Sequence, residues 1–180
     1  MNAGAGKALT SSAFELFDLP PAFSLDREML EKAYREIQSR VHPDRFAHSG
    51  DAERRASLQW TTRVNEAYRT LKDPVQRARH LLERHGVDVA FETNTKMPVD
   101  FLARQIEVRE TLEAAVERKD GAALDDLRRD FSGQRKSLEN EIARRIDANR
   151  DYPGAAELVR KLMFLQRLDE EIDSAYEAIE

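Results

Sequence analysis

Apolar residues recur at every third or fourth position along most of the chain, which is the spacing of one face of an α-helix. In the first half they predict helices over about 14–19, 27–40 and 51–71, and a further helix that starts at Asp73-Pro74 and ends at Gly86. The second and third helices each have one apolar stripe, so we expect them to pack as an antiparallel hairpin. The two stripes are Met29, Leu30, Ala33, Tyr34, Ile37 and Val41, and Ala56, Trp60, Val64, Ala67, Tyr68 and Leu71.

The second half of the chain has the same periodicity in three longer segments. Helices are expected over about 98–118, 121–149 and 155–179, separated by the turns "KDG" and "RDYPG". Because short connections make consecutive helices antiparallel neighbours, these segments predict a three-helix bundle. With strand patterns nearly absent, the predicted fold class is all-α, an N-terminal helical hairpin joined to a C-terminal antiparallel three-helix bundle.

The segment 87–97, "VDVAFETNTKM", has no helical period and is rich in turn-prone residues. We therefore place the domain boundary there or in the helix before it. The expected organisation is a disordered lead over 1–11, a first domain over 12–85, a linker over 86–97 and a second domain over 98–180.

Composition excludes several classes of function. The chain has 180 residues, 35% of them charged, with a net charge of -5 and both signs interspersed, so a nucleic-acid partner is not expected. No apolar run approaches the roughly 20 residues of a membrane span, and the start "MNAGAGKALTSS" lacks a signal or transit pattern. We therefore expect a cytoplasmic protein without a membrane partner.

The absence of cysteine removes disulfides, thiol catalysis and cysteine-ligated metal clusters.

The stretch "RVHPDRFAH" at 40–48 connects the second and third helices. It contains none of the Gly, Asn or Ser residues that usually make a turn. Pro43 forces His42 out of helical angles and towards an extended backbone. Asp44 follows at once, and a loop at the tip of a hairpin leaves side chains in water. Either His42 and Asp44 cap or cross-link the helix ends, or they are presented to a partner.

The tripeptide "HPD" between two antiparallel helices, followed by "RF" and later by "NEAYRTLKDP", resembles the J-domain. The resemblance implies that this loop and the exposed side of the preceding helix dock on a heat-shock-seventy class chaperone and stimulate its ATPase. An exposed carboxylate such as that of Asp44 could pair with an arginine of that partner. By resemblance, the docking residues are His42, Pro43, Asp44, Arg35, Arg40 and Arg45, with Arg27 and Lys32 as further basic candidates.

The first helix of the second domain has apolar residues on two different sides. A sector with Gln105 at its middle is expected to face the core: Phe101, Val108, Leu112, Ala115 and Val116. Leu102 and Ile106 lie outside this sector, and Phe164 lies off the core stripe of the last helix. These three residues are either scattered surface hydrophobes or a cover for the linker, or they form a binding surface.

The segments "FLARQIEVRETL" and "VRKLMFLQRLDEEI" resemble the C-terminal bundle of the HscB family, J-type co-chaperones of iron-sulfur cluster biogenesis. The resemblance implies a non-catalytic protein, of the bacterial type, that binds an IscU-type scaffold protein and delivers it to an HscA-type chaperone. The implied scaffold-binding residues are Leu102, Ala103, Ile106, Glu107, Glu110 and Phe164. Ala103 departs from the family, which often has a larger apolar residue there. Without thiolates the cluster must belong to the client, so no cofactor is expected.

Three other functions remain as alternatives. The bundle could recognise a different protein client of a J-domain co-chaperone. His80 and His85 could belong to a metal-dependent hydrolase, although a spacing of five turns them away from one another on a helix. Two helices with a short connection also resemble a DNA-binding helix-turn-helix, against which the acidic balance and the proline-containing loop both argue.

Overall fold

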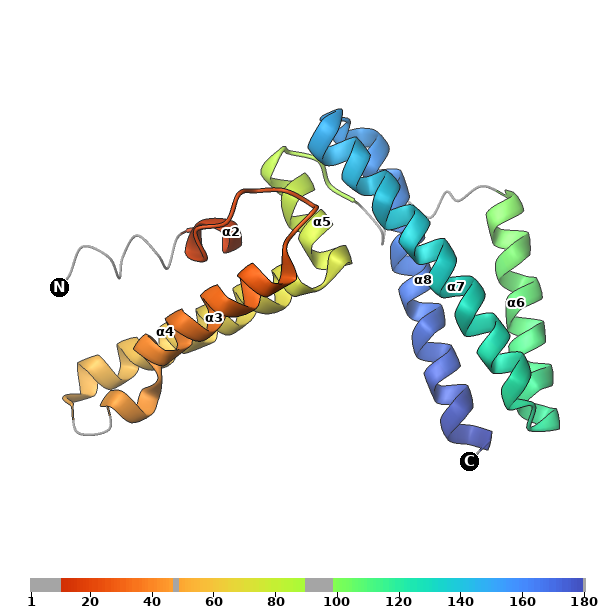
Figure 1. Ribbon diagram of the computed structural model, residues 1–180, viewed down its shortest axis with the longest axis horizontal. Coiled ribbons are helices and arrows are strands. Elements are labelled where there is room, and N and C mark those ends of the chain that lie inside the picture. Colours follow the sequence, from red (N-terminus) through yellow and green to blue (C-terminus); the bar gives the residue numbers. More distant parts are fainter. Residues whose placement is uncertain (1–10, 47–48, 90–98, 180) are drawn as a thin grey trace. The chain divides into compact units, whose positions relative to one another are not determined.

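The computed structural model describes residues 11–46, 49–89 and 99–179 (Figure 1). Within these residues all regular structure is helical, which confirms the predicted all-α class. The chain divides into two compact units, residues 1–86 and 87–180, so the division falls at the start of the predicted linker. Most of the expected lead, most of that linker and Pro98 lie outside the described residues.

The first unit is a long helical hairpin with two shorter helices. Its elements are α2 (Ala13–Leu16), α3 (Arg27–Val41), the 3-10 turn η1 (Pro43–Phe46), α4 (Asp51–Lys72) and α5 (Pro74–Arg84). The predicted start signals are confirmed, because Asp26 accepts hydrogen bonds from the N–H groups of Glu28 and Met29 at 2.9 and 3.2 Å. Asp73 caps α5 through the N–H of Gln76 at 2.8 Å. Each cap satisfies donors that a helix leaves without intrahelical partners.

The interface of α3 with α4 differs from the predicted stripes at two positions. Leu30, Val64, Ala67 and Leu71 are buried as expected, among the other core residues of this unit. The prediction was wrong for Met29, which is 54% exposed, because α3 packs on one helix and its buried face is narrow. It was also wrong for Ala56, which is exposed while the adjacent Ser57 is buried.

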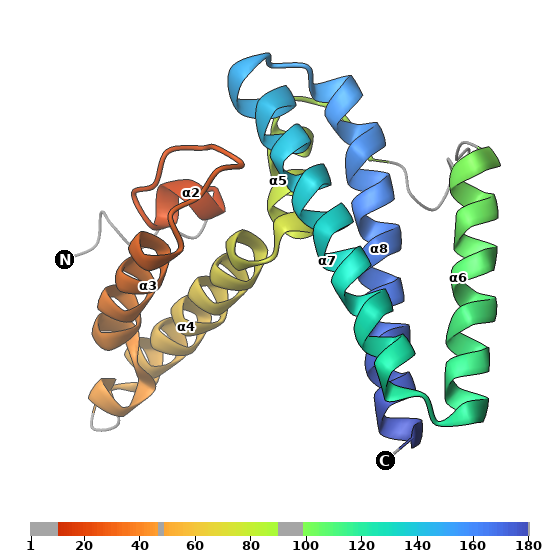
Figure 2. The same cartoon turned by 45° about the vertical axis from the view of Figure 1, so that its right-hand side comes forward.

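The second unit is the predicted three-helix bundle. It consists of α6 (Val99–Arg118), α7 (Gly121–Ala143), a π-helical turn η2 (Arg144–Ala148) and α8 (Tyr152–Ile179). Figure 2 shows α7 running antiparallel to α6 and α8. Its core contains Val108, Leu112, Ala115, Leu124, Phe131, Leu165, Leu168, Ile172 and Ala175. Gln105, predicted at the middle of the core sector of α6, is buried.

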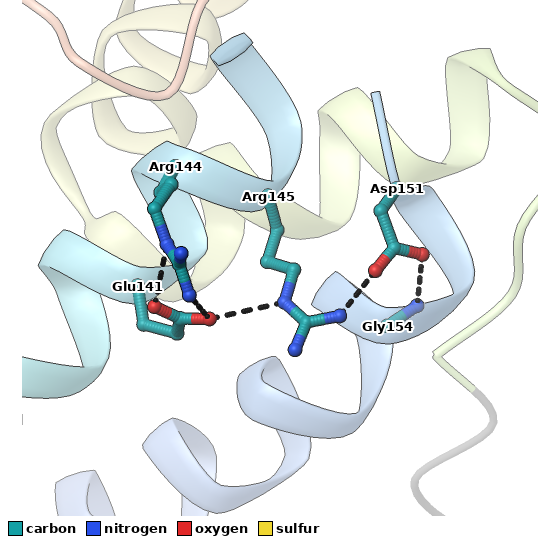
Figure 3. A network of polar contacts seen from close by, with 5 residues as sticks. All are labelled: Glu141, Arg144, Arg145, Asp151 and Gly154. Carbon is teal, nitrogen blue, oxygen red and sulfur yellow. Dashed lines mark hydrogen bonds and ion pairs between the residues drawn. The ribbon is translucent and has the colours of Figure 1, made fainter. Parts of the chain in front are cut away.

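The corner between α7 and α8 is tied by a network of arginines and carboxylates (Figure 3). Arg145 donates to Glu141 at 3.0 Å and also pairs with Asp151, while Arg144 donates to Glu141 at 2.7 Å. Asp151 accepts from the N–H of Gly154 at 3.0 Å and so caps α8. Hydrogen bonds from Arg144 lower the pKa of Glu141, and those from Arg145 lower the pKa of Asp151.

The cap formed by Asp151 shows that the last helix, α8, begins earlier than predicted. The sequence "RDYPG" was expected to be a turn, with the helix beginning at Ala155. The helix instead begins at Tyr152, because Pro153 lies in its first turn, where a missing N–H costs nothing.

Candidate functional site

The tip of the α3–α4 hairpin carries the "HPD" sequence in a defined turn. His42 follows α3 with φ -58° and ψ 131°, which confirms the extended backbone expected before a proline. Pro43 then begins η1, and the N–H of Arg45 donates to the carbonyl of His42 at 3.1 Å. The first part of the connection, Pro43–Phe46, is therefore a short 3-10 turn.

His42 and Asp44 contact each other and face solvent. The backbone N–H of Asp44 donates to Nδ1 of His42 at 3.3 Å, and Nδ1 lies 3.5 Å from Oδ2 of Asp44. Their side chains are 50% and 90% exposed, which confirms the expected exposure.

The position of the tip is set by side chains that the sequence reasoning missed. The carbonyl of Val41, at the end of α3, accepts from the hydroxyls of Ser57 and Thr61 on α4, at 2.7 and 3.1 Å. The carbonyl of Ser39 accepts from the guanidinium of Arg45 at 3.0 Å. These bonds satisfy carbonyls that a helix end leaves without intrahelical partners, and they fix the direction in which the turn leaves α3.

The basic residues of the hairpin differ in their contacts and in how accessible their guanidinium groups are. Glu31 lies between Arg27 and Arg35, with nitrogen-to-oxygen distances of 3.4 and 4.0 Å. Arg35 is 73% exposed in its side chain and Arg40 is exposed, so both guanidiniums are accessible. Arg45 is exposed as well, but its hydrogen bond to Ser39 gives it a structural role.

A second accessible surface lies on the N-terminal half of α6. Leu102 is 39% exposed and Ile106 is 60% exposed, so neither belongs to the core. Ala103, Glu107 and Glu110 are exposed beside them, and Glu107 pairs with Arg104 at 3.0 Å. The expected separation of these residues from the core is confirmed, while their role stays a prediction.

Phe164 joins this surface from α8. Its ring is partly buried and lies edge-on to that of Phe101, with the ring centroids 5.7 Å apart. The guanidinium of Arg109 lies 6.0 Å from the Phe164 centroid, within the range of a cation–π contact. The structure thus brings Phe164 against Phe101 and Arg109 of α6, while a shared role with Leu102 and Ile106 stays a prediction.

Arg109 is a residue that the sequence reasoning did not identify. Its guanidinium makes two hydrogen bonds across to Glu171 on α8, at 3.1 and 3.3 Å. The hydrogen bond with this carboxylate raises the pKa of the guanidinium. Nothing in the sequence pairs residues 62 positions apart, because the pairing depends on the register between α6 and α8.

The residues of the hydrolase alternative do not form a metal site. His80 lies against Phe14, with ring centroids 6.0 Å apart, and burial lowers its pKa. Among residues 11–46, 49–89 and 99–179, no cluster of three or more histidine, aspartate or glutamate side chains could hold a metal ion. The described helices also include none with the length and apolar content needed to cross a membrane.

Comparisons with known proteins match both units. The DnaJ domain family model matches residues 13–80, and the model for the HSCB C-terminal oligomerisation domain matches residues 97–173. A co-chaperone protein HscB homolog from Burkholderia thailandensis is 47% identical, with 96% of this chain and 98% of the relative covered. Its counterpart from Aromatoleum aromaticum is 45% identical, with coverages of 96% and 97%.

Two solved structures share the whole architecture. The chaperone HscB from Vibrio cholerae has a TM-score of 0.83 at 32% identity, covering 94% of this chain and 100% of that one. The human co-chaperone protein HscB has a TM-score of 0.84 at 28% identity, covering 91% and 81%. These similarities extend over nearly the full length of the chain and include both surfaces. The chain therefore belongs to the HscB family, the non-catalytic J-domain co-chaperones of iron-sulfur cluster assembly.

Proposed function

We propose that this protein binds an IscU-type iron-sulfur scaffold protein in the cytoplasm, presents it to an HscA-type chaperone of the heat-shock-seventy class, and stimulates that chaperone's ATPase. The observation that carries this proposal is the presence of two accessible surfaces on two separate compact units. One is the His42–Asp44 tip, and the other is the surface formed by Leu102, Ile106 and Phe164.

The tip supplies the contact with the chaperone. Asp44 is 90% exposed, so its carboxylate can form a charge-assisted hydrogen bond to an arginine of the partner. Pro43 and the bonds to Val41 keep the tip in one conformation before docking, which lowers the entropy cost of binding. The exposed side chains of Arg35 and Arg40 on α3, and of Arg45 in η1, favour an acidic surface on the chaperone.

The surface on α6 and α8 supplies the contact with the scaffold. Leu102 and Ile106 offer apolar side chains, and Phe164 offers a ring held between Phe101 and Arg109. Glu107 and Glu110 form a polar rim, as in interfaces with an apolar centre. Ala103 contributes less apolar area than a larger residue would, at a cost of about 25 cal/mol per Å² of contact not made.

Such a protein acts by bringing its two partners close together. Binding the scaffold and the chaperone at the same time raises the effective concentration of each near the other. The chain itself makes or breaks no covalent bond in this scheme. Stimulation of the ATPase and binding of the scaffold are therefore separable by mutation.

Two variants test this separation. Asp44→Asn should lower ATPase stimulation by about tenfold or more, because it removes the charged acceptor while keeping its size. Leu102→Ala with Phe164→Ala should weaken scaffold binding by about tenfold or more, because it truncates the centre of the interface. Steady-state ATP hydrolysis by the chaperone and calorimetric titration of the scaffold measure the two effects.

Matched controls exist on the chain. Asp18→Asn changes an exposed carboxylate at a positive φ of 52°, which asparagine tolerates, and it should leave stimulation unchanged. Leu58→Ala truncates a leucine that is 55% exposed in the first unit and should leave scaffold binding unchanged. Loss of both activities from either test variant, in a folded protein, would contradict the two-surface arrangement. Binding of an unfolded protein but not of the scaffold would indicate another client.

A further inference from the structure

A groove between α6 and α8 remains outside both surfaces described so far. It has a volume of about 650 Å³ and is lined by Leu112, Glu113, Glu170 and Glu171 among others. A second hollow of about 430 Å³ shares Leu112, Glu113 and Glu171 with it and continues to Val116, Glu117 and Ala175. The two hollows form one open channel along neighbouring helices of the same unit.

The groove begins where the Leu102–Phe164 surface ends. Arg109 lies at this junction, because its guanidinium contacts both the ring of Phe164 and the carboxylate of Glu171. On α6, residues 102, 106, 113 and 117 are separated by intervals of four, seven and four, so they lie on one side of the helix. A ligand that covers Ile106 and continues along α6 therefore enters the groove.

The groove has an apolar floor. Leu112 and Ala175 are buried to 9% and 4% exposure, and Val116 is partly buried beside them. The floor can therefore receive apolar side chains, but most of its own surface is already covered by the bundle. Apolar contact with the floor alone would give a weak and unspecific site.

The walls of the groove are acidic. Four carboxylates line its two halves, on Glu113, Glu117, Glu170 and Glu171, against the guanidiniums of Arg109 and Arg167. Arg109 and Glu171 pair with each other. Glu113, Glu117 and Glu170 are exposed, and none of them forms an ion pair within the described residues. Charge complementarity thus favours a segment with lysines or arginines flanking an apolar stripe.

We propose that the groove is a second part of the client surface, and that it binds a basic amphipathic segment of the scaffold protein. This inference depends on the proposed scaffold-binding function. The Leu102–Phe164 surface binds an apolar patch of the client, and the groove binds basic side chains one to three helical turns further along α6. Glu113 and Glu170, on opposite walls, make the principal charge contacts.

Charge reversal in the full-length protein tests the groove. The variant Glu113→Lys/Glu170→Lys should weaken binding of the iron-sulfur scaffold protein about tenfold or more in calorimetric titrations at low salt. The difference from the parent protein should shrink as the ionic strength rises, because salt screens exposed charges. The matched control is Asp130→Lys/Glu157→Lys, which makes the same change in net charge on exposed residues of α7 and α8 outside the groove. It should change the affinity less than about twofold.

The outcomes distinguish this inference from the proposed function. Equal affinities of the groove variant and the control, together with weak binding by Leu102→Ala/Phe164→Ala, would overturn the groove and leave scaffold binding intact. Normal binding by all three variants would overturn the proposed function itself. A groove variant that binds scaffold normally but loses ATPase stimulation, or that changes oligomeric state in light scattering, would assign the groove to another occupant and overturn the inference. The far-UV circular dichroism of each variant establishes that it is folded.

Discussion

Gly133 lies in the interior of α7 with open space around it. A Cβ built there meets nothing within 4 Å, and its φ is not positive. Gly133→Ala should therefore stabilise the protein by about 0.5–1 kcal/mol, because alanine loses less backbone entropy in a helix. Equilibrium denaturation followed by circular dichroism measures the change.

Gly86 provides the opposite case for comparison. A Cβ there would also meet nothing, but its φ is +71°, in the left-handed region that favours glycine after a helix. Gly86→Ala should destabilise the protein by about 1 kcal/mol. If both substitutions changed the free energy of unfolding in the same direction, backbone conformation would not be the controlling factor at these sites.

Single residues also show the limits of reasoning from sequence. The exposure of His42 and Asp44 could be predicted, because Pro43 acts locally on the residue before it. The burial of Ser57 could not be predicted, because a serine on a helix is expected to face solvent. It is buried here because its hydroxyl donates to the carbonyl of Val41, 16 residues earlier. Leu102 and Ile106 were predictable from periodicity within one helix, whereas Arg109 required the position of Glu171 on another.

At the scale of elements, the α3–α4 hairpin supports the tip that we propose as the chaperone-docking site. Ser57→Ala would leave the Thr61 hydroxyl as the remaining donor from α4 to the Val41 carbonyl. We expect a loss of about 1 kcal/mol in stability and faster hydrogen exchange in residues 42–46. Stimulation of the chaperone ATPase should fall in parallel, because the tip is less well positioned. Ser57→Thr keeps the hydroxyl and should restore the slow exchange; failure to do so would separate exchange from this hydrogen bond.

Helix starts were predicted better than helix junctions. Asp26 and Asp73 are strong local signals, and the structure uses both as caps. The start of α8 was misplaced by three residues, because "DYPG" contains a turn signal and a capping signal at once. Arg145 of η2 pairs with Asp151 and so holds it in the capping position before α8 (Figure 3). Such a choice depends on a contact between elements and is not visible in either segment alone.

At the scale of the whole molecule, the two units differ in their histidine content. All four histidines of the sequence precede residue 87. Burial lowers the pKa of His80 below its ordinary value of 6.5, so the unfolded chain takes up a proton before the folded chain does as the pH falls. The stability contributed by neutral His80 is therefore complete above its unfolded pKa and is lost as the pH falls from that value towards the folded pKa.

This asymmetry has a direct readout, because the single tryptophan, Trp60, also lies in the first unit. Denaturation followed by its fluorescence should show lower stability at about pH 5.5 than at about pH 7.5. His80→Phe, which can keep the stacking on Phe14, should flatten this dependence. Protection factors for hydrogen exchange in α7 and α8, which are corrected for the intrinsic pH dependence of exchange, should change little over the same range. An unchanged pH dependence in the variant would assign the effect to another group.

The π-helical turn η2 gives the corner of the bundle a tolerance in chain length. A π turn contains about one residue more than an α turn, and one residue corresponds to a rotation of about 100° in a regular helix. The wider turn lies between two buried side chains, Ile142 of α7 and Ala155 of α8. We therefore expect that a residue gained or lost in this corner would be taken up by the turn, and that the proposed client-facing side of α8 would stay in phase with α6.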